Sequence, residues 1–490
     1  MSTNGPLYTL AVTEEENDEP KSPLFSFLTH RLRICLFMAL AMYFGVSNRI
    51  SLSVGVVCMT NSTTTISSSH SKCTSTVVEH EEEFLPHQGE MDWSQLQQSM
   101  LLSASFYGNF ATVLFSGGIA DQFGAAKILI AALSASSILT LLVPSIARIS
   151  YTMLLISRVL YGVIESFVIP SVNSLASKWF PKFEKTTMVA FYTNGLQLAA
   201  GFGSLFASQL CKSELLGGWP SIFSVFGILT IVYVILFGIF ANDDPQRNRW
   251  VSRAEKRFLR EHVKPPAKKP SMGSAPWKSM VRSKPLHAVL TCSFAFGFAT
   301  SIMQAFLPKY LKDELGLRVA TIGLYTLAPF LAQMIAKAIV GPLTDYVAGR
   351  GWISLTNATK VAQSIGSFGA TVMLLLLAFL PSCDSASFVL PILIIYGTVY
   401  SGGVCGYYAS LLAIAPHYTG TISSLSQVAK MAASILSTGF VTLLSTVDTP
   451  YKWAFVFSCA AFFQAAAGLH YILCGSAEKE SWSDIKEGSR

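Results

Sequence analysis

Four charged residues stand inside long apolar runs, where a charge is costly to place. They are Arg49, Arg158, Lys337 and Glu165. A charged side chain within a bilayer costs about 3 kcal/mol or more unless it is paired or wetted, so each is a candidate for function. Guanidinium groups bind carboxylate or phosphate oxygens through a fork of N–H donors, and a buried carboxyl group can exchange a proton. Three cations against one carboxylate predict that an anion is bound.

The spacing of these residues leaves structural alternatives open. Arg158 and Glu165 are seven residues apart, which places them on one helix face about 10 Å apart. They are too distant for a direct salt bridge, so they either line one aqueous cavity or tie their helix to its neighbours. Arg49 lies about 23 Å along its run and either contacts a substrate or reaches the outer headgroups. Lys337 lies about 12 Å inside the end marked by Asp345 and either faces the cavity or reaches that boundary.

Membrane-spanning helices must position these residues, because the composition excludes most other classes of protein. Of 490 residues, 51% are hydrophobic and 13% are charged, whereas soluble domains carry about 25% charged residues. Apolar runs of roughly 20 residues, the length that crosses a bilayer, recur along the chain. Soluble enzymes, coiled coils and disordered scaffolds are therefore excluded. The net charge of +7 comes from basic residues around the apolar runs, a pattern typical of membrane topology and not of nucleic-acid binding.

Apolar length and helix breakers predict an all-α membrane protein with twelve transmembrane helices in two six-helix halves. The spans are expected at 34–58, 97–118, 126–147, 151–176, 187–211 and 219–241, and then at 287–308, 320–343, 354–380, 388–412, 421–445 and 452–474. Two similar halves with a substrate site between them are typical of secondary transporters. The expected domains are an N-terminal tail (1–33), an N-terminal bundle (34–241) with a loop at 59–96, a basic loop (242–286), a C-terminal bundle (287–474) and a C-terminal tail (475–490).

The distribution of basic residues predicts the topology. The segment 242–283 contains eleven Lys and Arg residues against four acids, and positive residues collect on the cytosolic side. An even number of spans separates this loop from each end, so both termini are predicted to be cytosolic. The loop 59–96 then faces outward or into a lumen. It contains Asn61-Ser62-Thr63, which makes Asn61 a candidate glycosylation site.

Two similar motifs follow the second and eighth predicted spans. One reads Gly117-Gly118-Ile119-Ala120-Asp121-Gln122-Phe123-Gly124, and the other reads Gly341-Pro342-Leu343-Thr344-Asp345. Small residues allow helices to approach closely, and an Asp at a helix end can cap or pair with a neighbour. The duplication argues against an ordinary glycine turn, and the motifs resemble the signature loop of the major facilitator superfamily, which implies a conformational latch. The latch residues are Gly117, Gly118, Asp121, Gly124, Gly341 and Asp345.

The cysteines and the remaining motifs indicate neither a metal site nor an enzyme. The nine cysteines show no zinc spacing, so no metal ligands are predicted. Cys58 stands just before the 59–96 loop and Cys73 lies within it, and the two are a candidate pair, which the spacing alone does not establish. The spans contain no motif of a membrane protease or lipid hydrolase and no phosphate-binding glycine loop.

Several segments of the chain resemble the anion:cation symporters of the major facilitator superfamily. They include SNRISLSVGVV, SRVLYGVIESFVIPSVNSLASKWFP, LPKYLKDELGL and WAFVFSCAAFFQAAAGLHYILCGSAEKESWSD, in consistent order from about residue 34 to about residue 484. That group contains sialin, the vesicular glutamate and nucleotide transporters and the type I sodium-phosphate transporters. The resemblance implies the major facilitator fold with the duplicated motif as a cytosolic latch. It also implies that Arg49, Arg158 and Glu165 occupy the substrate-binding and proton-coupling positions.

The chain departs from members of this group at several positions. Phe296 stands where the vesicular glutamate transporters have a seventh-span arginine, and Leu411 and Ala413 replace a histidine and an aspartate of that subgroup. Thr359 replaces the arginine of an Arg-Lys pair, and Tyr161 stands where sialin has an additional glutamate. These departures argue against glutamate as the substrate and leave transport of acidic sugars open.

The sequence therefore predicts a secondary active transporter of a small organic or inorganic anion, of the carboxylate, acidic sugar or phosphate class. Arg49, Arg158 and Lys337 are expected to bind the anion, and Glu165 is expected to couple a proton or sodium ion, with no other cofactor. A transporter-like anion receptor and a facilitative uniporter are the alternatives. The expected partners are the anion and the bilayer, without nucleic acid, and the chain is expected to work as a monomer in the plasma membrane or an organelle or vesicle membrane.

Overall fold

Helices account for almost all of the protein that the computed structural model describes, which is residues 29–60, 90–93, 95–212, 217–263, 276–315, 319–380, 388–446 and 451–483. Nine helical stretches within these residues are long and apolar enough to cross a membrane. They are α1 (His30–Met59), α3 (Ala125–Ile149), α4 and α5 (Tyr151–Glu165 and Val168–Trp179), α8 (Pro220–Phe240), α11 (Lys284–Ala305), α13 (Val319–Gly349), α14 (Leu355–Phe379), α15 and α16 (Val389–Tyr400 and Ala409–Ile414) with the π-helical turn η6 (Val404–Tyr408) between them, and α18 (Lys452–Cys474).

Three further stretches of similar length are richer in Ser, Thr, Gly and Gln. They are α2 (Gln95–Phe123), α17 (Thr419–Thr446), and α6 (Lys185–Leu198) continued by the π-helical turn η2 (Ala199–Gly203) and α7 (Ser204–Lys212). Their polar residues suit helices that pack against protein as well as lipid, because small and hydroxylated side chains allow close approach. The predicted all-α membrane fold is confirmed, and these stretches are consistent with the predicted count of twelve.

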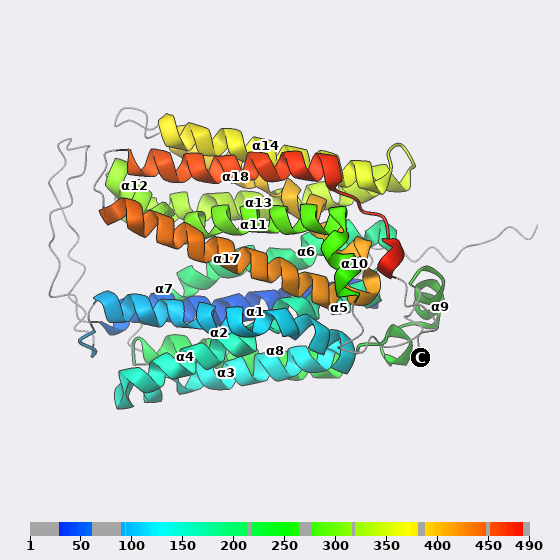
Figure 1. Ribbon diagram of the computed structural model, residues 1–490. Helices are drawn as coiled ribbons and strands as arrows, with labels where there is room; N and C mark the ends of the chain where they lie inside the picture. The colour runs from blue at the N-terminus through cyan, green and yellow to red at the C-terminus, as the bar shows by residue number, and fades with distance from the viewer. Residues whose placement is uncertain are drawn as a thin grey trace, which may run out of the picture.

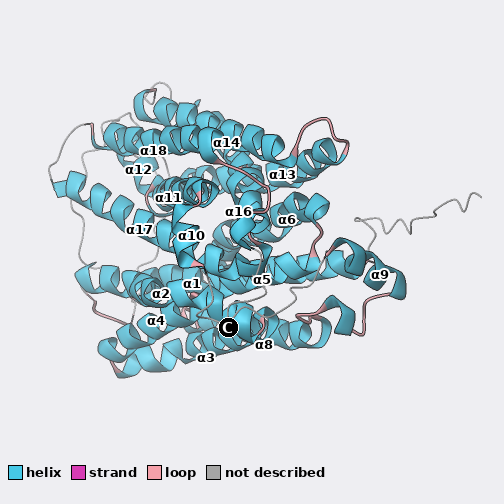
Figure 2. Cartoon of the chain, turned by 45° about the vertical axis from the view of Figure 1, so that its right-hand side comes forward, coloured by secondary structure: helices cyan, strands magenta, loops and turns pink. Residues whose placement is uncertain are grey.

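The long helices form two groups that lie side by side and meet along two helix pairs (Figure 1). The N-terminal group contains α1 to α8, and the C-terminal group contains α11 to α18, with α12 (Leu307–Leu315) continuing from α11. At the interface α2 packs against α17, and α6 packs against α13. The second view shows the same two groups with their long helices still aligned (Figure 2). Movement of one group against the other would therefore change the contacts made by α2, α6, α13 and α17.

Helix α9 (Arg253–His262), which lies between the two groups in the sequence, is held against the first of them. It lies at one end of the molecule (Figure 1), which we call the basic end. Glu255 accepts hydrogen bonds from the backbone N–H groups of His30 and Arg31, at 3.0 and 2.9 Å, and so satisfies donors that the first turn of α1 leaves unpaired. The Arg31 side chain is fully buried between Glu255 and Glu184. Burial raises the pKa of Glu184, and the charge of Arg31 opposes that rise.

This arrangement differs from the predicted boundary at one point. The sequence analysis assigned 1–33 to a tail, whereas α1 begins at His30. The reason is that Glu255, which is distant in sequence, caps the first turn of α1 and compensates the charge of Arg31. The apolar run alone does not show this extra turn.

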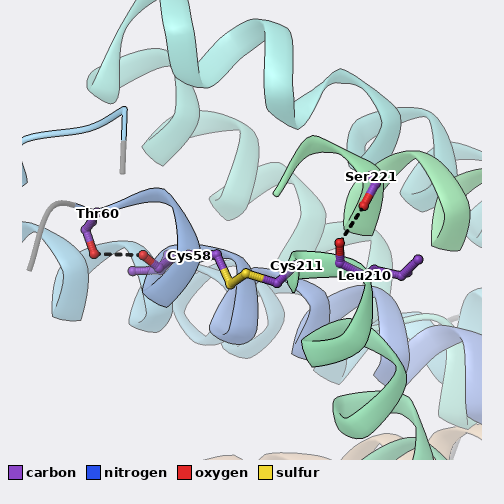
Figure 3. Close-up of a disulfide and its surroundings, with 6 residues drawn as sticks. Cys58, Thr60, Leu210, Cys211 and Ser221 are labelled. Carbon is purple, nitrogen blue, oxygen red and sulfur yellow. Dashed lines mark hydrogen bonds between the residues drawn. A yellow bond between two sulfur atoms is a disulfide. The ribbon is translucent and has the colours of Figure 1, made fainter. Parts of the chain in front are cut away.

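A disulfide between Cys58 and Cys211 joins the end of α1 to the end of α7 (Figure 3). We call this end of the molecule the disulfide end. The structure therefore corrects the candidate pairing of Cys58 with Cys73, because Cys58 is already bonded to a cysteine 153 residues away. Cys73 itself lies outside the described residues. The pairing was not visible from the sequence, since it depends on the first and fifth spans lying together at this end.

Replacing Cys58 by Ser is expected to lower the free energy of unfolding by about 2–4 kcal/mol, because the disulfide closes a long loop in the unfolded chain. Thermal unfolding of the purified protein, with and without reductant, measures the change. Cys474→Ser is the matched control, since Cys474 is a free cysteine near the end of α18. A Cys58→Ser protein that unfolds at the wild-type temperature, together with a wild type insensitive to reductant, would contradict the structural role.

Candidate functional site

Two spans at equivalent places in the two groups are interrupted near their middles. In the N-terminal group α4 ends at Glu165, and a turn at Ser166 and Phe167 precedes α5. In the C-terminal group α15 ends at Tyr400, and a turn at Ser401 precedes the π-helical turn η6. These are the fourth and tenth spans, which correspond when the second six helices are matched to the first six. Interrupted helices at matching positions indicate the substrate site of a transporter, and π-helical turns often occur at functional sites.

Arg49 and Glu165 form an ion pair between α1 and the interrupted span. The Arg49 Nη1 and Glu165 Oε1 atoms are 3.2 Å apart, and the two side chains are 27% and 10% exposed. The Arg49 guanidinium also lies 5.8 Å from the ring centroid of Phe106 in α2. The structure thus joins two of the residues that the sequence analysis selected, although the analysis did not predict that they pair. Their partial exposure leaves the pair accessible to a small solute or an ion.

Arg158 lies deeper in the N-terminal group and is only 2% exposed. Its guanidinium carbon is 5.6 Å from the ring centroid of Tyr161 and 5.9 Å from that of Phe223 in α8. Its Nε and Nη2 atoms have no hydrogen-bond partner among the described residues. The Tyr161 hydroxyl is occupied, since it donates to the Gly45 carbonyl at 2.9 Å. A buried guanidinium with unpaired N–H donors is the kind of group that an anionic ligand would satisfy.

Lys337 and Lys430 bring two basic side chains into the middle of the C-terminal group. Lys337, on α13, is 1% exposed and donates to the Gln197 side chain of α6 at 2.8 Å. Lys430, on α17, lies 5.1 Å from the ring centroid of Tyr408. The sequence analysis selected Lys337 and missed Lys430. The available signal was the position of Lys430 within the predicted span 421–445, eleven residues after α17 begins at Thr419.

Phe296, on α11, is part of a stack of aromatic rings. Its ring is stacked on that of Tyr400, with centroids 3.8 Å apart, and lies 5.3 Å from the Tyr407 ring. The Tyr400 hydroxyl donates to the Phe296 carbonyl at 2.8 Å. At this position the seventh span therefore contributes apolar surface, and the basic groups of the C-terminal half come from α13 and α17.

The first latch motif contacts the C-terminal group at the start of α17. The Asp121 carboxylate accepts a hydrogen bond from the Thr421 backbone N–H at 3.2 Å and another from the Ser174 hydroxyl at 2.6 Å. Gly117 packs directly against the Gly420 backbone, where any side chain would overlap, and its N–H donates to the Ser424 hydroxyl at 2.8 Å. Asp121 thus caps a helix of the other half, where the N-terminus of a helix favours negative charge.

The second latch motif makes the reciprocal contact with the start of α6. The Asp345 carboxylate accepts a hydrogen bond from the Thr187 backbone N–H at 2.6 Å. A side chain on Gly341 would begin 2.6 Å from the Cβ atom of Ala190. Each motif therefore caps the first turn of a helix in the opposite group. The two contacts occupy equivalent positions in the two halves.

The remaining two glycines of the first motif sit at the end of α2. Gly118 is partly buried within the helix. Gly124 has φ +106°, a conformation that side chains rarely allow, and it connects α2 to α3. The carboxylate of Asp243 then accepts from the Ala126 N–H at 3.1 Å and caps α3. Gly124 shapes a turn within one half and, unlike Gly117, lies outside the contact with α17.

Hydrogen bonds between the two groups occur in the middle of the molecule and toward the basic end. In the middle of the molecule, Gln197 donates to Gln333 at 2.8 Å. From Gln197 toward the disulfide end, the described residues of α6 and α7 make no further hydrogen bond to the C-terminal group. Towards the basic end, the Asn173 amide donates to Ser423 at 2.6 Å and Lys185 donates to the Leu412 carbonyl at 3.1 Å. The two halves are thus joined at the basic end in this conformation.

Gly117→Val is expected to reduce transport about tenfold, because the overlap with Gly420 opposes the joined conformation by roughly 1–3 kcal/mol. Solute uptake into vesicles containing the purified protein measures the effect. Gly439→Val is the matched control, since Gly439 lies on α17 with open space where a side chain would begin. Equal uptake by the Gly117 and Gly439 variants would show that this close approach is not needed for the transport cycle.

Two predictions concern metals and modification. In the part of the chain that the structure describes, no group of three or more His, Cys, Asp or Glu side chains is arranged to hold a metal ion. The candidate glycosylation site Asn61 lies outside the described residues, so that prediction stays a prediction.

Comparison with known proteins places this geometry in context. Residues 34–438 match the family profile described as Major Facilitator Superfamily. The chain is 28% identical to "Sodium-dependent phosphate transport protein 3" of Mus musculus, over 93% of this chain and 96% of that protein. It is 26% identical to "Probable small intestine urate exporter" of Homo sapiens, over 93% and 92% of the two chains. Its fold is similar to that of the Escherichia coli fucose:proton symporter, with TM-score 0.63 at 12% identity, covering 91% of this chain and 100% of that one.

Proposed function

This chain belongs to the Major Facilitator Superfamily, and from that premise we propose that it is a secondary active transporter of a small anion. The chain is a multi-pass membrane transporter and not an enzyme, as its family and its relatives indicate. The predicted resemblance is confirmed at this level. The phosphate cotransporter and urate exporter among its relatives support an anionic substrate, which we assign to the carboxylate, acidic sugar or phosphate class.

One observation carries the proposal: Arg158 is buried in the N-terminal half with two guanidinium nitrogens that lack a partner among the described residues. A charge in this position has a high desolvation cost, and a protein that keeps it needs a compensating group. Glu165 is engaged by Arg49 at 3.2 Å and therefore does not compensate Arg158. An anionic substrate would supply the missing acceptor atoms.

We propose that transport follows alternating access. In the present conformation the latch carboxylates Asp121 and Asp345 hold the basic end together. Release of these caps would let the two groups separate there while they approach at the disulfide end, which would move access to the site from one side to the other.

Glu165 is proposed to couple the anion to a cation gradient. It ends α4 at the interruption of the fourth span and pairs with Arg49. Protonation of Glu165 would release Arg49 to bind the anion, and loss of the proton would restore the ion pair. A proton is therefore the favoured coupling ion, with sodium as the second candidate, and no further cofactor is required.

The topology remains part of the proposal. We propose that the basic end and both termini lie on the cytosolic side, which is supported by α9 at that end and by the excess of Lys and Arg in the sequence of the insert. The disulfide between Cys58 and Cys211 supports a non-cytosolic position for the other end, because disulfides persist in oxidising compartments. We propose that the chain works as a monomer in the plasma membrane or an organelle membrane.

Uptake into proteoliposomes tests the function. The purified chain is reconstituted and supplied with radiolabelled phosphate, urate, glucuronate and succinate, each with and without an imposed pH or sodium gradient. Accumulation above the external concentration of any of these anions supports symport. Equilibration without accumulation would indicate a uniporter. Saturable binding without flux would indicate a receptor and would overturn the proposal.

A further inference from the structure

Lys430 stands in the middle of the C-terminal half, on α17 and beside the interrupted tenth span. Its ammonium group lies 5.1 Å from the ring centroid of Tyr408 and 5.9 Å from that of Tyr407, which belong to the π-helical turn of the interrupted tenth span. Among the described residues it takes part in no salt bridge. Aromatic faces stabilise a desolvated cation less than an anionic partner would.

Lys337 is the second cation of this region and is likewise without a carboxylate partner in the described part of the chain. Its ammonium group donates to Gln197, whose amide in turn donates to Gln333. Helix α13 packs against the same π-helical turn that lies beside Lys430. Val340, one turn along α13 from Lys337, packs against a cluster that includes Cys405 of that turn. Asp345, the acid nearest to Lys337 along α13, is eight residues away. Its Oδ2 atom accepts from the Thr187 N–H, and its Oδ1 atom has no partner among the described residues. The Gln197 amide that accepts from Lys337 and the aromatic rings beside Lys430 are thus neutral groups.

The two lysines lie at one level of the membrane. Lys430 is eleven residues after the start of α17, or about 16 Å along the helix, and Lys337 is twelve residues before the end of α13, or about 18 Å. Both distances run from the basic end. Arg49 is nineteen residues after the start of α1, or about 28 Å from the same end. The lysines therefore lie roughly 10 Å nearer the basic end than Arg49, in the other half of the protein.

Both lysines are tied to contacts that change when the halves move. Lys337 holds Gln197 of the opposite group. The Tyr408 hydroxyl, beside Lys430, donates to Asn173 of the opposite group at 2.9 Å. Asn173 also accepts from Tyr192 and donates to Ser423. An anion at the lysines would compete with these neutral partners, so its binding is linked to the joining of the halves.

We propose, on the basis of the transport function proposed above, that Lys337 and Lys430 form a second anion-binding position, which selects substrates carrying two negative charges. Two ammonium groups without a carboxylate partner among the described residues are neutralised by a divalent anion and only half neutralised by a monovalent one. While Glu165 is ionised it compensates Arg49, so Arg158 is then the cation that the N-terminal half offers to an anion. Phosphate-type oxyanions and dicarboxylates share the required chemistry.

Ligand-dependent thermal unfolding tests this position independently of transport. The full chain in lipid nanodiscs is titrated at pH 7 and constant ionic strength with two matched pairs of anions. One pair is inorganic phosphate and dimethyl phosphate, and the other is succinate and monomethyl succinate. Within each pair the skeleton is similar and the charge differs. The pair that shows the larger difference identifies whether an oxyanion or a dicarboxylate fits better.

The wild type is expected to be stabilised at lower concentrations of the divalent member of at least one pair. Lys430→Gln and Lys337→Gln should raise the half-maximal concentration of that divalent anion about tenfold and that of its monovalent partner less than about threefold. Lys430→Arg, which keeps the charge, should retain the preference. Lys278→Gln is the control, because Lys278 is exposed on α10 (Trp277–Arg282) and far along the chain from both lysines.

The proposal is overturned if the wild type responds equally to both members of each pair or to none of the four anions. It is also overturned if both Gln variants keep the wild-type preference. If one Gln variant does not fold, the other and Lys430→Arg decide the question. Failure of the proposed transport function would appear instead as absence of accumulation in proteoliposomes, which this binding measurement does not use.

Discussion

Arg158→Ala is expected to reduce anion uptake by at least about tenfold, and up to about a hundredfold, because a lost charge-assisted hydrogen bond costs roughly 1.5–3 kcal/mol. The guanidinium is 2% exposed, and its Nε and Nη2 atoms have no partner among the described residues. The variant loses no hydrogen bond between these two atoms and the described residues. The reduced uptake would therefore reflect a lost contact with the ligand. Initial rates of phosphate and urate uptake into proteoliposomes measure it.

Two further variants separate ligand binding from structural support. Arg158→Lys keeps the positive charge without the fork of N–H donors and should retain a minor part of the uptake. Arg148→Ala is the matched control: Arg148 is 54% exposed and pairs with Glu90 at 3.1 Å, where an exposed ion pair contributes little. Wild-type uptake by Arg158→Ala would remove this residue from the mechanism.

The unfolding temperature provides a second readout for Arg158. Removing a buried cation that lacks a full set of partners relieves a desolvation cost. It also removes contacts with the rings of Tyr161 and Phe223, and the two effects oppose each other. The Arg158→Ala protein should therefore unfold within a few degrees of the wild type. A large loss of stability together with lost uptake would instead indicate that Arg158 supports the N-terminal bundle.

The spans and their order were predictable from the sequence because the underlying physics is local. A run of apolar residues of bilayer length must form a helix, since hydrocarbon offers no other partner for the backbone. For the same reason Arg49, Arg158, Glu165 and Lys337 were recognisable, because a charge inside such a run is conspicuous whatever the tertiary structure. The family resemblance then identified the same arginines and glutamate.

The pairing of residues was less predictable because it depends on how separate helices are rotated and where they end. Arg158 and Glu165 were selected for their common helix face, yet the partner of Glu165 is Arg49 of another span. Cys58 likewise bonds to Cys211 and not to a cysteine of its own loop. Neither contact follows from residue spacing within one segment.

Lys430 and the capping of α1 were missed for a different reason. Lys430 lies in a span that is rich in Ser and Thr, where one lysine contrasts less with its neighbours than it would among Leu and Ile. Glu255 lies in a highly charged insert, so nothing in its local sequence distinguishes it from solvated residues. Its role becomes visible only when α9 is seen at the start of α1.

Glu165→Gln is expected to abolish the response of uptake to an imposed pH gradient while leaving anion exchange at a measurable rate. The carboxylate lies 3.2 Å from Arg49 at the interruption between α4 and α5, so its charge decides whether Arg49 is compensated by the protein or by a substrate. The amide is similar in size but carries no charge and cannot take up or release a proton. Uptake driven by a pH gradient should fall about tenfold or more, whereas counterflow, which needs no net cation movement, should continue.

Glu90→Gln is the matched control, because Glu90 is an exposed carboxylate that also pairs with an arginine. It should leave the response to a pH gradient at the wild-type level. A sodium gradient that drives the wild type, with no response to pH, would identify sodium as the coupled ion, and Glu165→Gln should then lose the sodium response. Full gradient-driven accumulation by Glu165→Gln, with either ion, would contradict the coupling role. The charge of Glu165 would then serve only to hold Arg49, and the coupling carboxylate would have to be sought elsewhere in the chain.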